Sequence, residues 1–312
     1  MYPSISFKSA LLADGCAIVI SCPNPAAGVK TISVSQRVII NPGTGWLSDP
    51  TGPEKAYTVL GGTSTTALGT LQEVIAVPAN DVELAPEHLS DVEAAALPLA
   101  GLTAWRAFST KSGNAEAGRN ILITGIGGGV AIMVLMFAVA KGCNVFVTSS
   151  STDKIARARA LGAKGGVDYT DEEGWAKKVQ KLLPKGRPFL DAVIDGAGGD
   201  IVGSTWRLLK MGGVIVSYGM TSLEQPAFPM QAVMKNIELK GSTMGSRREF
   251  GEMVQFVREK KIRPVVERVV NSIENLEGIE GLFEDMKVGR HFGKLVVKID
   301  GDRKEYTGGS KL

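Results

Sequence analysis

The sequence is poor in the residues that build metal sites and disulfides. It has three cysteines and two histidines among 312 residues. Cys16, Cys22 and Cys143 lack the spacing of a zinc site, and their odd number argues against a disulfide framework. His88 lies beside a predicted helix start and His291 precedes the last predicted strand. We therefore expect a reducing compartment and no bound metal, neither a structural nor a catalytic zinc ion.

The chain also lacks a strong charge and a long apolar run. Its 35 Lys and Arg residues nearly balance its 32 Asp and Glu residues, for a net charge of +3. This small, scattered charge indicates a solvated surface and argues against a nucleic-acid or membrane partner. The apolar run 130–140 is too short to cross a bilayer and fits a buried helix. The N-terminus shows no signal-peptide pattern.

Glycine is abundant, with 38 residues placed at turns between apolar runs. Residues 1 to about 90 hold short β-type runs such as "CAIVIS", "QRVIINP", "AYTVLGG" and "LQEVIAVP". A helical pattern with a proline in its middle follows, "DVEAAALPLAGLTAWRAF". Strands then alternate with helices, which we expect at 129–141, 152–161, 172–183, 200–210 and about 248–260. The strands are continuous apolar runs, which predicts an α/β, doubly wound parallel sheet.

The stretch "ITGIGGGVA", residues 123–131, joins a predicted strand to a predicted helix. That context is what a dinucleotide-binding turn requires. Gly125 would make the tight turn, Gly128 would let the backbone approach a pyrophosphate, and Ala131 would allow close packing. The phosphate would lie on the helix N-terminus. The alternative is a glycine-rich corner without a ligand.

The residues after the next strand indicate which dinucleotide binds. In NAD-binding proteins a carboxylate holds the ribose there, but this chain has "TSSSTDK", residues 148–154. The hydroxyls of Ser149 and Ser150 and the ammonium of Lys154 suit the 2′-phosphate of NADPH. Asp153 weakens the charge argument, and the serines also fit a helix N-cap.

The final tripeptide, Ser310-Lys311-Leu312, is the peroxisomal import address when it ends a chain. The preceding "DRKEYTGG" is polar and should keep residues 301–312 a flexible, accessible tail. We expect localisation in the peroxisome matrix and an import receptor as partner.

Several motifs together resemble the medium-chain dehydrogenase/reductase family, especially its zinc-less quinone oxidoreductase and enoyl reductase branch. They are "LPLAGLTAW" at 97–105, "ITGIGGGVA" at 123–131, "ARALGAKGGVDYTD" at 158–171, "VIDGAGG" at 193–199, "LLKMGGVIVSYG" at 208–219 and "HFGKLVVKI" at 291–299. The resemblance implies a chaperonin-10-like catalytic domain, residues 1–97 and 263–300, and a Rossmann domain, residues 98–262. It places the nicotinamide between the two domains.

The resemblance also implies site residues. The phosphate turn carries over onto Gly125, Gly128, Gly129 and Val130, and the 2′-phosphate site onto Ser150, Lys154 and Tyr169. The nicotinamide side carries over onto Thr103, Gly196, Tyr218 and Gly219, and Lys294 approaches the cofactor in this family. Members commonly pair through the Rossmann sheet edge, so a homodimer is expected through "GVIVSYG" and "IELKGSTM".

Two features depart from the family pattern. Asp14, in "LLADGCAI", stands where zinc-dependent members have a histidine, and "SQR" at 35–37 replaces a Gly-Asp-Arg turn. The match also begins well inside the usual catalytic domain, so the resemblance implies an abbreviated, truncated domain.

Without zinc, hydride transfer from NADPH to an activated double bond or a quinone needs only positioning and a donor for the enolate oxygen. Candidate donors are Thr103, Tyr57 and Tyr218, with Asn41 and Trp46 as substrate wall. Packing of a surface lobe explains Trp46 and Tyr57 equally well. We expect an NADPH-dependent, zinc-independent reductase of α,β-unsaturated carbonyls or quinones. One alternative is a redox-inactive member or a lyase or cyclase that uses the abbreviated cleft; a second is an alcohol dehydrogenase activated by zinc.

Overall fold

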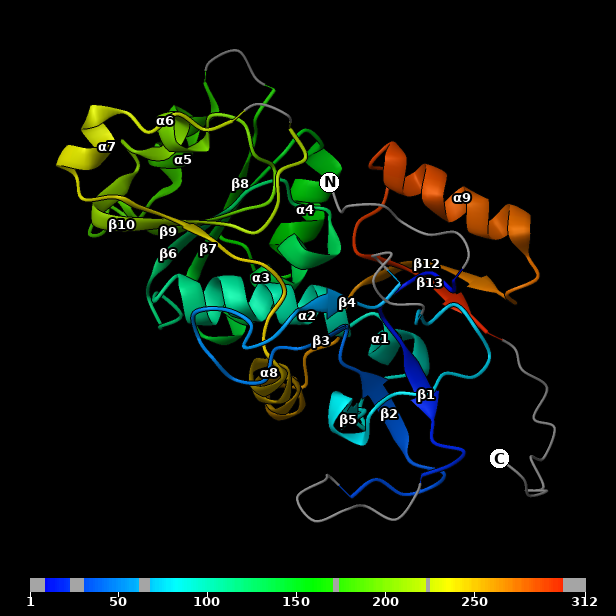
Figure 1. Cartoon of the computed structure of the whole chain (residues 1–312). Coiled ribbons are helices and arrows are strands. Elements are labelled where there is room, and N and C mark those ends of the chain that lie inside the picture. The colour runs from blue at the N-terminus through cyan, green and yellow to red at the C-terminus, as the bar shows by residue number, and fades with distance from the viewer. Residues whose placement is uncertain (1–8, 23–30, 62–67, 171–173, 223–224, 300–312) are drawn as a thin grey trace. The chain divides into compact units, whose positions relative to one another are not determined.

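The computed structural model describes residues 9–22, 31–61, 68–170, 174–222 and 225–299 (Figure 1). The chain divides into two compact units. The first unit comprises residues 1–99, 246–288 and 295–312, and the second comprises residues 100–245 and 289–294. The predicted tail, with the tripeptide Ser310-Lys311-Leu312, lies outside the described residues.

A six-stranded parallel sheet forms the second unit, in the order β11-β10-β9-β6-β7-β8. Its strands are β6 (Asn120–Ile123), β7 (Asn144–Ser149), β8 (Gly165–Asp168), β9 (Leu190–Asp195), β10 (Leu209–Ser217) and β11 (Glu238–Gly241). Strands β7 and β8 follow β6 toward one edge of the sheet, and strands β10 and β11 follow β9 toward the other. This is the Rossmann arrangement, and the predicted α/β fold class is confirmed.

Burial explains why these runs form strands. Every residue of β6 and β9 is buried, as expected for central strands covered on both faces. The helices between the strands are α3 (Gly129–Ala140), α4 (Thr152–Ala160), α5 (Trp175–Leu182), α6 (Ile201–Thr205) and α7 (Met230–Met234). Helix α3 is apolar around its whole circumference and mostly buried, and it packs on β6 and β7.

The single long helix expected from residue 91 is divided into three pieces. Helix α1 (Asp91–Ala95) begins at a Ser90 capping box, and α2 (Pro98–Trp105) begins at the proline. A proline suits the first position of a helix, because the N–H that it lacks has no partner there. A π-helix (Arg106–Lys111) then continues from α2.

The first unit holds short strands and two longer helices. An antiparallel sheet is formed by β1 (Cys16–Ile18), β2 (Arg37–Ile40) and β5 (Val82–Leu84). Strand β3 (Gly43–Thr44) pairs with β4 (Thr58–Val59), and β12 (Val266–Asn271) with β13 (Lys294–Lys298). The remaining elements are a 3-10 turn (Ala79–Asp81) and helices α8 (Arg247–Lys260) and α9 (Leu276–Lys287).

Four further details differ from the sequence-based expectations. The helix expected at 200–210 ends at Thr205, because the buried run that begins at Leu209 forms β10. Residues 71–78 form no strand, since Val74 is half exposed and β5 takes the place beside β2. Helix α8 belongs to the first unit, because Arg247 pairs there with Glu83. Residues 289–294 belong to the second unit, where Gly293 donates to the Gly127 carbonyl oxygen at 2.8 Å. Within the described ranges no helix combines the length and apolar character needed to cross a membrane.

Candidate functional site: a dinucleotide turn in the second unit

The turn between β6 and α3 has a backbone that only glycine adopts readily. Gly125 has φ of +60° and Gly127 has φ of +144°. These backbone conformations are strained for any residue that has a Cβ atom. Gly128 is extended and precedes the first residue of α3, Gly129. Among the described residues no side chain caps this helix start. Its N–H groups are therefore open to an anion.

Space for that anion lies at Gly128. No atom outside the neighbouring residues comes within 4 Å of where a Cβ on Gly128 would stand. Ala131 is buried, as close helix packing requires, and Val130 is half-buried beside it. The residues present thus fit the pyrophosphate of a dinucleotide.

Lys154 lies at the rim of this turn. Its Nζ is 3.0 Å from the place of a Cβ on Gly127, and it donates to the Gly289 carbonyl oxygen at 2.5 Å. Lys154 belongs to the first turn of α4, which Ser151 caps by accepting its backbone N–H at 3.3 Å. The serine cap and the cation at the turn are therefore both present.

The other residues predicted for the 2′-phosphate differ in exposure. Ser149 is buried, and its hydroxyl donates to the Ile126 carbonyl oxygen at 3.4 Å, so it closes the turn instead of facing a ligand. Ser150 is exposed. Tyr169 is half exposed and donates its backbone N–H to the Ser149 carbonyl oxygen at 3.0 Å, which places it beside the end of β7.

Lys294 lies over the beginning of α3. Its Cδ is 2.7 Å from where a Cβ on Gly129 would stand, so glycine there leaves room for the lysine chain. The residue before it, Gly293, is hydrogen-bonded to the glycine turn. The structure thus brings Lys294 and Lys154 to opposite ends of one turn.

The residues predicted for the nicotinamide side follow β9 and β10. The ring of Tyr218 packs on Gly196, where a Cβ would come within 2.4 Å of the phenol oxygen. Burial, together with the charge of Asp195, raises the pKa of Tyr218, so its hydroxyl stays protonated. Gly219 is exposed directly after it. Thr103 is buried in α2, and its hydroxyl is 3.6 Å from the sulfur of Met244.

The residues predicted for the substrate wall cluster in the first unit but are largely buried. Asn41 is buried and donates to the Gly43 carbonyl oxygen at 2.7 Å. Trp46 is 3% exposed, donates to the Asp49 carbonyl oxygen, and meets Tyr57 edge-on with ring centroids 5.7 Å apart. Asn41 and Trp46 therefore hold this lobe together.

Two buried residues at the edge of the sheet were missed in the sequence. Thr124 directly follows β6 and Asp195 ends β9, and the hydroxyl of Thr124 donates to the carboxylate of Asp195 at 2.5 Å. The signal was available in "VIDGAGG", where a carboxylate directly follows the apolar run 192–194.

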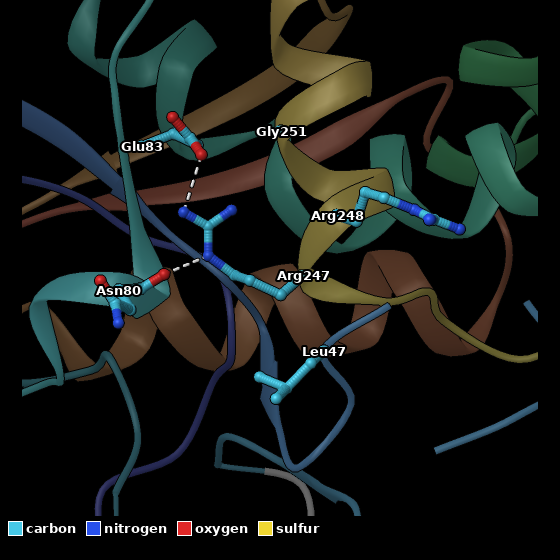
Figure 2. A pocket seen from close by; sticks show the side chains of 6 residues that line it. All are labelled: Leu47, Asn80, Glu83, Arg247, Arg248 and Gly251. Carbon is cyan, nitrogen blue, oxygen red and sulfur yellow. Dashed lines mark hydrogen bonds and ion pairs between the residues drawn. The ribbon is translucent and has the colours of Figure 1, made fainter. Parts of the chain in front are cut away.

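A cavity of about 410 Å³ opens in the first unit, and its lining includes none of the site residues predicted from the sequence. Figure 2 shows Arg247 directed toward Glu83 and Asn80, with Arg248 pointing away. Arg247 pairs with Glu83 at 2.7 Å, and Arg248 lies 3.7 Å from Glu252. The two arginines are thus engaged by this unit's own acceptors.

A zinc ion would take its ligands from His, Cys, Asp and Glu side chains. In the part of the chain that the structure describes, no three His, Cys, Asp or Glu side chains gather as a metal site requires. Asp14 accepts the Leu99 backbone N–H at 2.6 Å and so holds the start of α2. His88 contacts the Ile262 carbonyl oxygen at 2.9 Å. Cys143 is buried, and burial raises the pKa of its thiol to about 11.

Comparisons with known proteins agree with this geometry. The family model for zinc-binding dehydrogenases matches residues 129–259. The chain is 52% identical over 303 residues to the zinc-type alcohol dehydrogenase-like protein YogA of Leptosphaeria maculans, covering 96% of this chain and 85% of that protein. The chain belongs to the medium-chain dehydrogenase/reductase family. As a member of that family it is an oxidoreductase.

Solved structures of the family share the fold. The crystal structure of an NAD-dependent alcohol dehydrogenase superposes with a TM-score of 0.81 at 30% identity, covering 95% of this chain and 84% of that one. The 2-octenoyl-CoA carboxylase reductase CinF, in complex with NADP and 2-octenoyl-CoA, superposes with a TM-score of 0.79 at 22% identity, covering 95% and 69%. The second likeness shows the fold alone.

Proposed function

We propose that this oxidoreductase uses NADPH to reduce an activated double bond, in an α,β-unsaturated carbonyl compound or a quinone, without zinc. The observation that carries the proposal is a contrast within the chain. The dinucleotide turn is complete and open at Gly128, while the described His, Cys, Asp and Glu residues form no metal cluster.

The choice of NADPH rests on Lys154. Its ammonium lies at Gly127, beside the end of β7, where NAD-binding proteins place a carboxylate. A cation and the exposed Ser150 there favour the 2′-phosphate of NADPH over the 2′-hydroxyl of NADH. The phosphate carries about two negative charges, whereas the hydroxyl carries none.

The choice of reaction rests on the donors in the second unit. When bound, NADPH supplies a hydride, and the protein supplies orientation and a hydrogen bond to the oxygen that gains charge. Thr103 is suited to that bond because its hydroxyl donates to a thioether, the sulfur of Met244, a weak acceptor that it can exchange at little cost. The protonated phenol of Tyr218 is the second candidate.

Hydride transfer without a metal ion limits the class of substrate that the protein can reduce. A conjugated C=C bond accepts hydride at carbon while its carbonyl oxygen takes one hydrogen bond, and the enolate so formed takes a proton from solvent, so no Lewis acid is needed. CinF shows that the same fold holds NADP together with an enoyl thioester in another protein. Enones, quinones and enoyl thioesters are therefore the substrates to test.

Two further proposals concern partners and location. We propose a homodimer through the edge of the sheet, where exposed apolar side chains lie on and near β11: Met211, Met230, Val233, Met234 and Leu239. We also propose import into peroxisomes through Ser310-Lys311-Leu312. A fluorescent protein fused to the N-terminus should collect in peroxisomes and stay diffuse when the tripeptide is deleted.

The test of the main proposal is a fluorescence titration of purified protein with NADPH and, separately, NADH. Binding of NADPH at least tenfold tighter than NADH is expected. Equal affinity would contradict the assigned role of Lys154, and binding of neither would favour a redox-inactive member.

The names of the relatives favour a second candidate, a zinc-dependent alcohol dehydrogenase. Protein stripped of metal with a chelator and then supplied with Zn²⁺ distinguishes the two. Oxidation of a simple alcohol that appears only with Zn²⁺ would support the dehydrogenase, whereas zinc-independent reduction of an enone would exclude it.

A further inference from the structure

Two turns at the carboxyl edge of the parallel sheet converge on one buried carboxylate, Asp195. The turn after β9 donates to it twice, from the backbone N–H groups of Ala197 and Gly198, each at 3.2 Å. The turn after β6 donates through the hydroxyl of Thr124 at 2.5 Å. The turn after β10 begins with Tyr218, whose N–H donates to the backbone carbonyl oxygen of Asp195 at 2.9 Å and so continues the β9–β10 pairing.

Further contacts extend this network into the glycine turn. Thr124 accepts the Gly196 N–H at 3.3 Å and immediately precedes Gly125. A Cβ on Gly125 would be 3.5 Å from that of Ala197, so the two turns touch. Strands β6 and β9 are neighbours at the point where the strand order reverses, which is where Rossmann folds bind dinucleotides (Figure 1).

The carboxylate has an unusual environment for a buried charge. Asp195 has no exposed surface, and in the described part of the chain it forms no ion pair. Burial raises its pKa, so the charge opposes folding. An unpaired buried carboxylate is retained most readily where it serves a function.

The opposite end of the same strand gives the contrast. Asp191 is equally buried, but it pairs with Lys210 and Arg187 at 2.8 Å and with Arg119 at 3.1 Å. These cations lower the pKa of Asp191 to about 2, so its charge stabilises the fold.

We propose that Asp195 is a positioning residue that, with Thr124, holds the turns after β6 and β9 in the shape that binds NADPH. The proposal rests on the proposed function, because it assigns these turns to the cofactor. A carboxylate accepts from all three donors at once. An asparagine presents only one accepting atom, and its NH₂ group would face a backbone N–H.

The first experiment compares Asp195→Asn with Asp191→Asn, by NADPH fluorescence titration and by thermal unfolding. For Asp195→Asn we expect at least a tenfold weaker Kd and a Tm within about 3 °C of the native protein, because lost hydrogen bonds offset relieved charge burial. For Asp191→Asn we expect an unchanged Kd and a Tm lower by about 5 °C or more.

The second experiment separates hydrogen bonding from packing at Thr124, which is 4% exposed. Thr124→Ser keeps the hydroxyl and loses a methyl group, whereas Thr124→Val keeps the shape and loses the hydroxyl. The serine variant should bind NADPH within about threefold of the native protein, and the valine variant at least tenfold more weakly. The reverse order would overturn the proposal.

The outcomes distinguish the two proposals. If the native protein binds NADPH and Asp195→Asn binds it equally well, the positioning role is refuted while the proposed function stands. An Asp195→Asn variant that loses as much Tm as Asp191→Asn also refutes it. A native protein that binds neither dinucleotide overturns both.

Discussion

At the scale of single residues, the proposed preference for NADPH over NADH depends on Lys154. Lys154→Met keeps the length of the side chain but removes the ammonium from the glycine turn. We expect NADPH affinity to fall by about ten- to a hundredfold, since a charge-assisted bond is lost, and NADH affinity to stay within about twofold. Isothermal titration of both cofactors measures this. Lys177→Met, on the exposed side of α5, is the matched control and should change neither affinity.

The donor assignment leads to a second residue-scale prediction. Thr103→Val should lower kcat for an enone by about ten- to a thousandfold, as loss of an oxyanion donor does, with little change in the Kd of NADPH. Stopped-flow measurement of NADPH consumption separates the two quantities. A full kcat in this variant would exclude Thr103 and leave Tyr218 as the donor.

Sequence reasoning reached the glycines and Lys154 because a strand-turn-helix context and a missing carboxylate are local signals. It did not find that Ser149 or Asn41 is buried, and for Trp46 it left open both packing of its own lobe and a substrate wall. Burial depends on neighbours distant in the chain, such as the β8 partner of Ser149. Asp195 was missed for the same reason, because its partner Thr124 is 71 residues away.

At the scale of elements, the conformation of the β6–α3 turn can be tested against a matched glycine. Gly127 has φ of +144° and Gly118 has φ of +79°, so alanine strains the backbone at both. Each substitution should cost about 1 kcal/mol of stability. Only Gly127→Ala should weaken NADPH binding, by tenfold or more, because its Cβ would push Lys154 aside. Equal binding by both variants would show that the turn only reverses the chain.

The helices α3, α4 and α8 were predicted to within one or two residues, because each has a clear start. Ser151 and Ser246 cap α4 and α8, and Gly128 precedes α3. The long helix from residue 91 was not divided correctly, since a proline inside an apolar pattern permits either a kink or a new start. The unit boundary at α8 depends on the Arg247–Glu83 pair, which no local pattern reveals.

At the scale of the whole molecule, stability should fall in acid through Asp191. Its pKa is lowered from 3.8 to about 2, so its contribution is complete above pH 4 and is lost as the pH falls toward 2. We expect about 1–2 kcal/mol after allowing for the partly exposed cations. Urea unfolding at pH 6 and pH 3 should show a smaller loss for Asp191→Asn than for the native protein. Equal losses would assign the acid sensitivity to other groups.

The proposed dimer gives the last whole-molecule prediction. Met234 is 73% exposed on α7, and Met286 is 57% exposed on α9 in the other unit. Met234→Glu should convert the dimer to a monomer, because a charge in an apolar interface stays unpaired, whereas Met286→Glu should not. Light scattering after size exclusion measures the mass. A native protein that elutes as a monomer would remove the proposal.

The central claim is zinc-independent hydride transfer from NADPH. It is tested most directly by mixing chelator-treated, metal-free protein with NADPH and a conjugated enone, and by counting NADPH oxidised against saturated ketone formed. The account predicts one-to-one stoichiometry, no stimulation by Zn²⁺ and slower turnover with NADH. Turnover that requires Zn²⁺, or tight NADPH binding without oxidation by any enone or quinone, would contradict it.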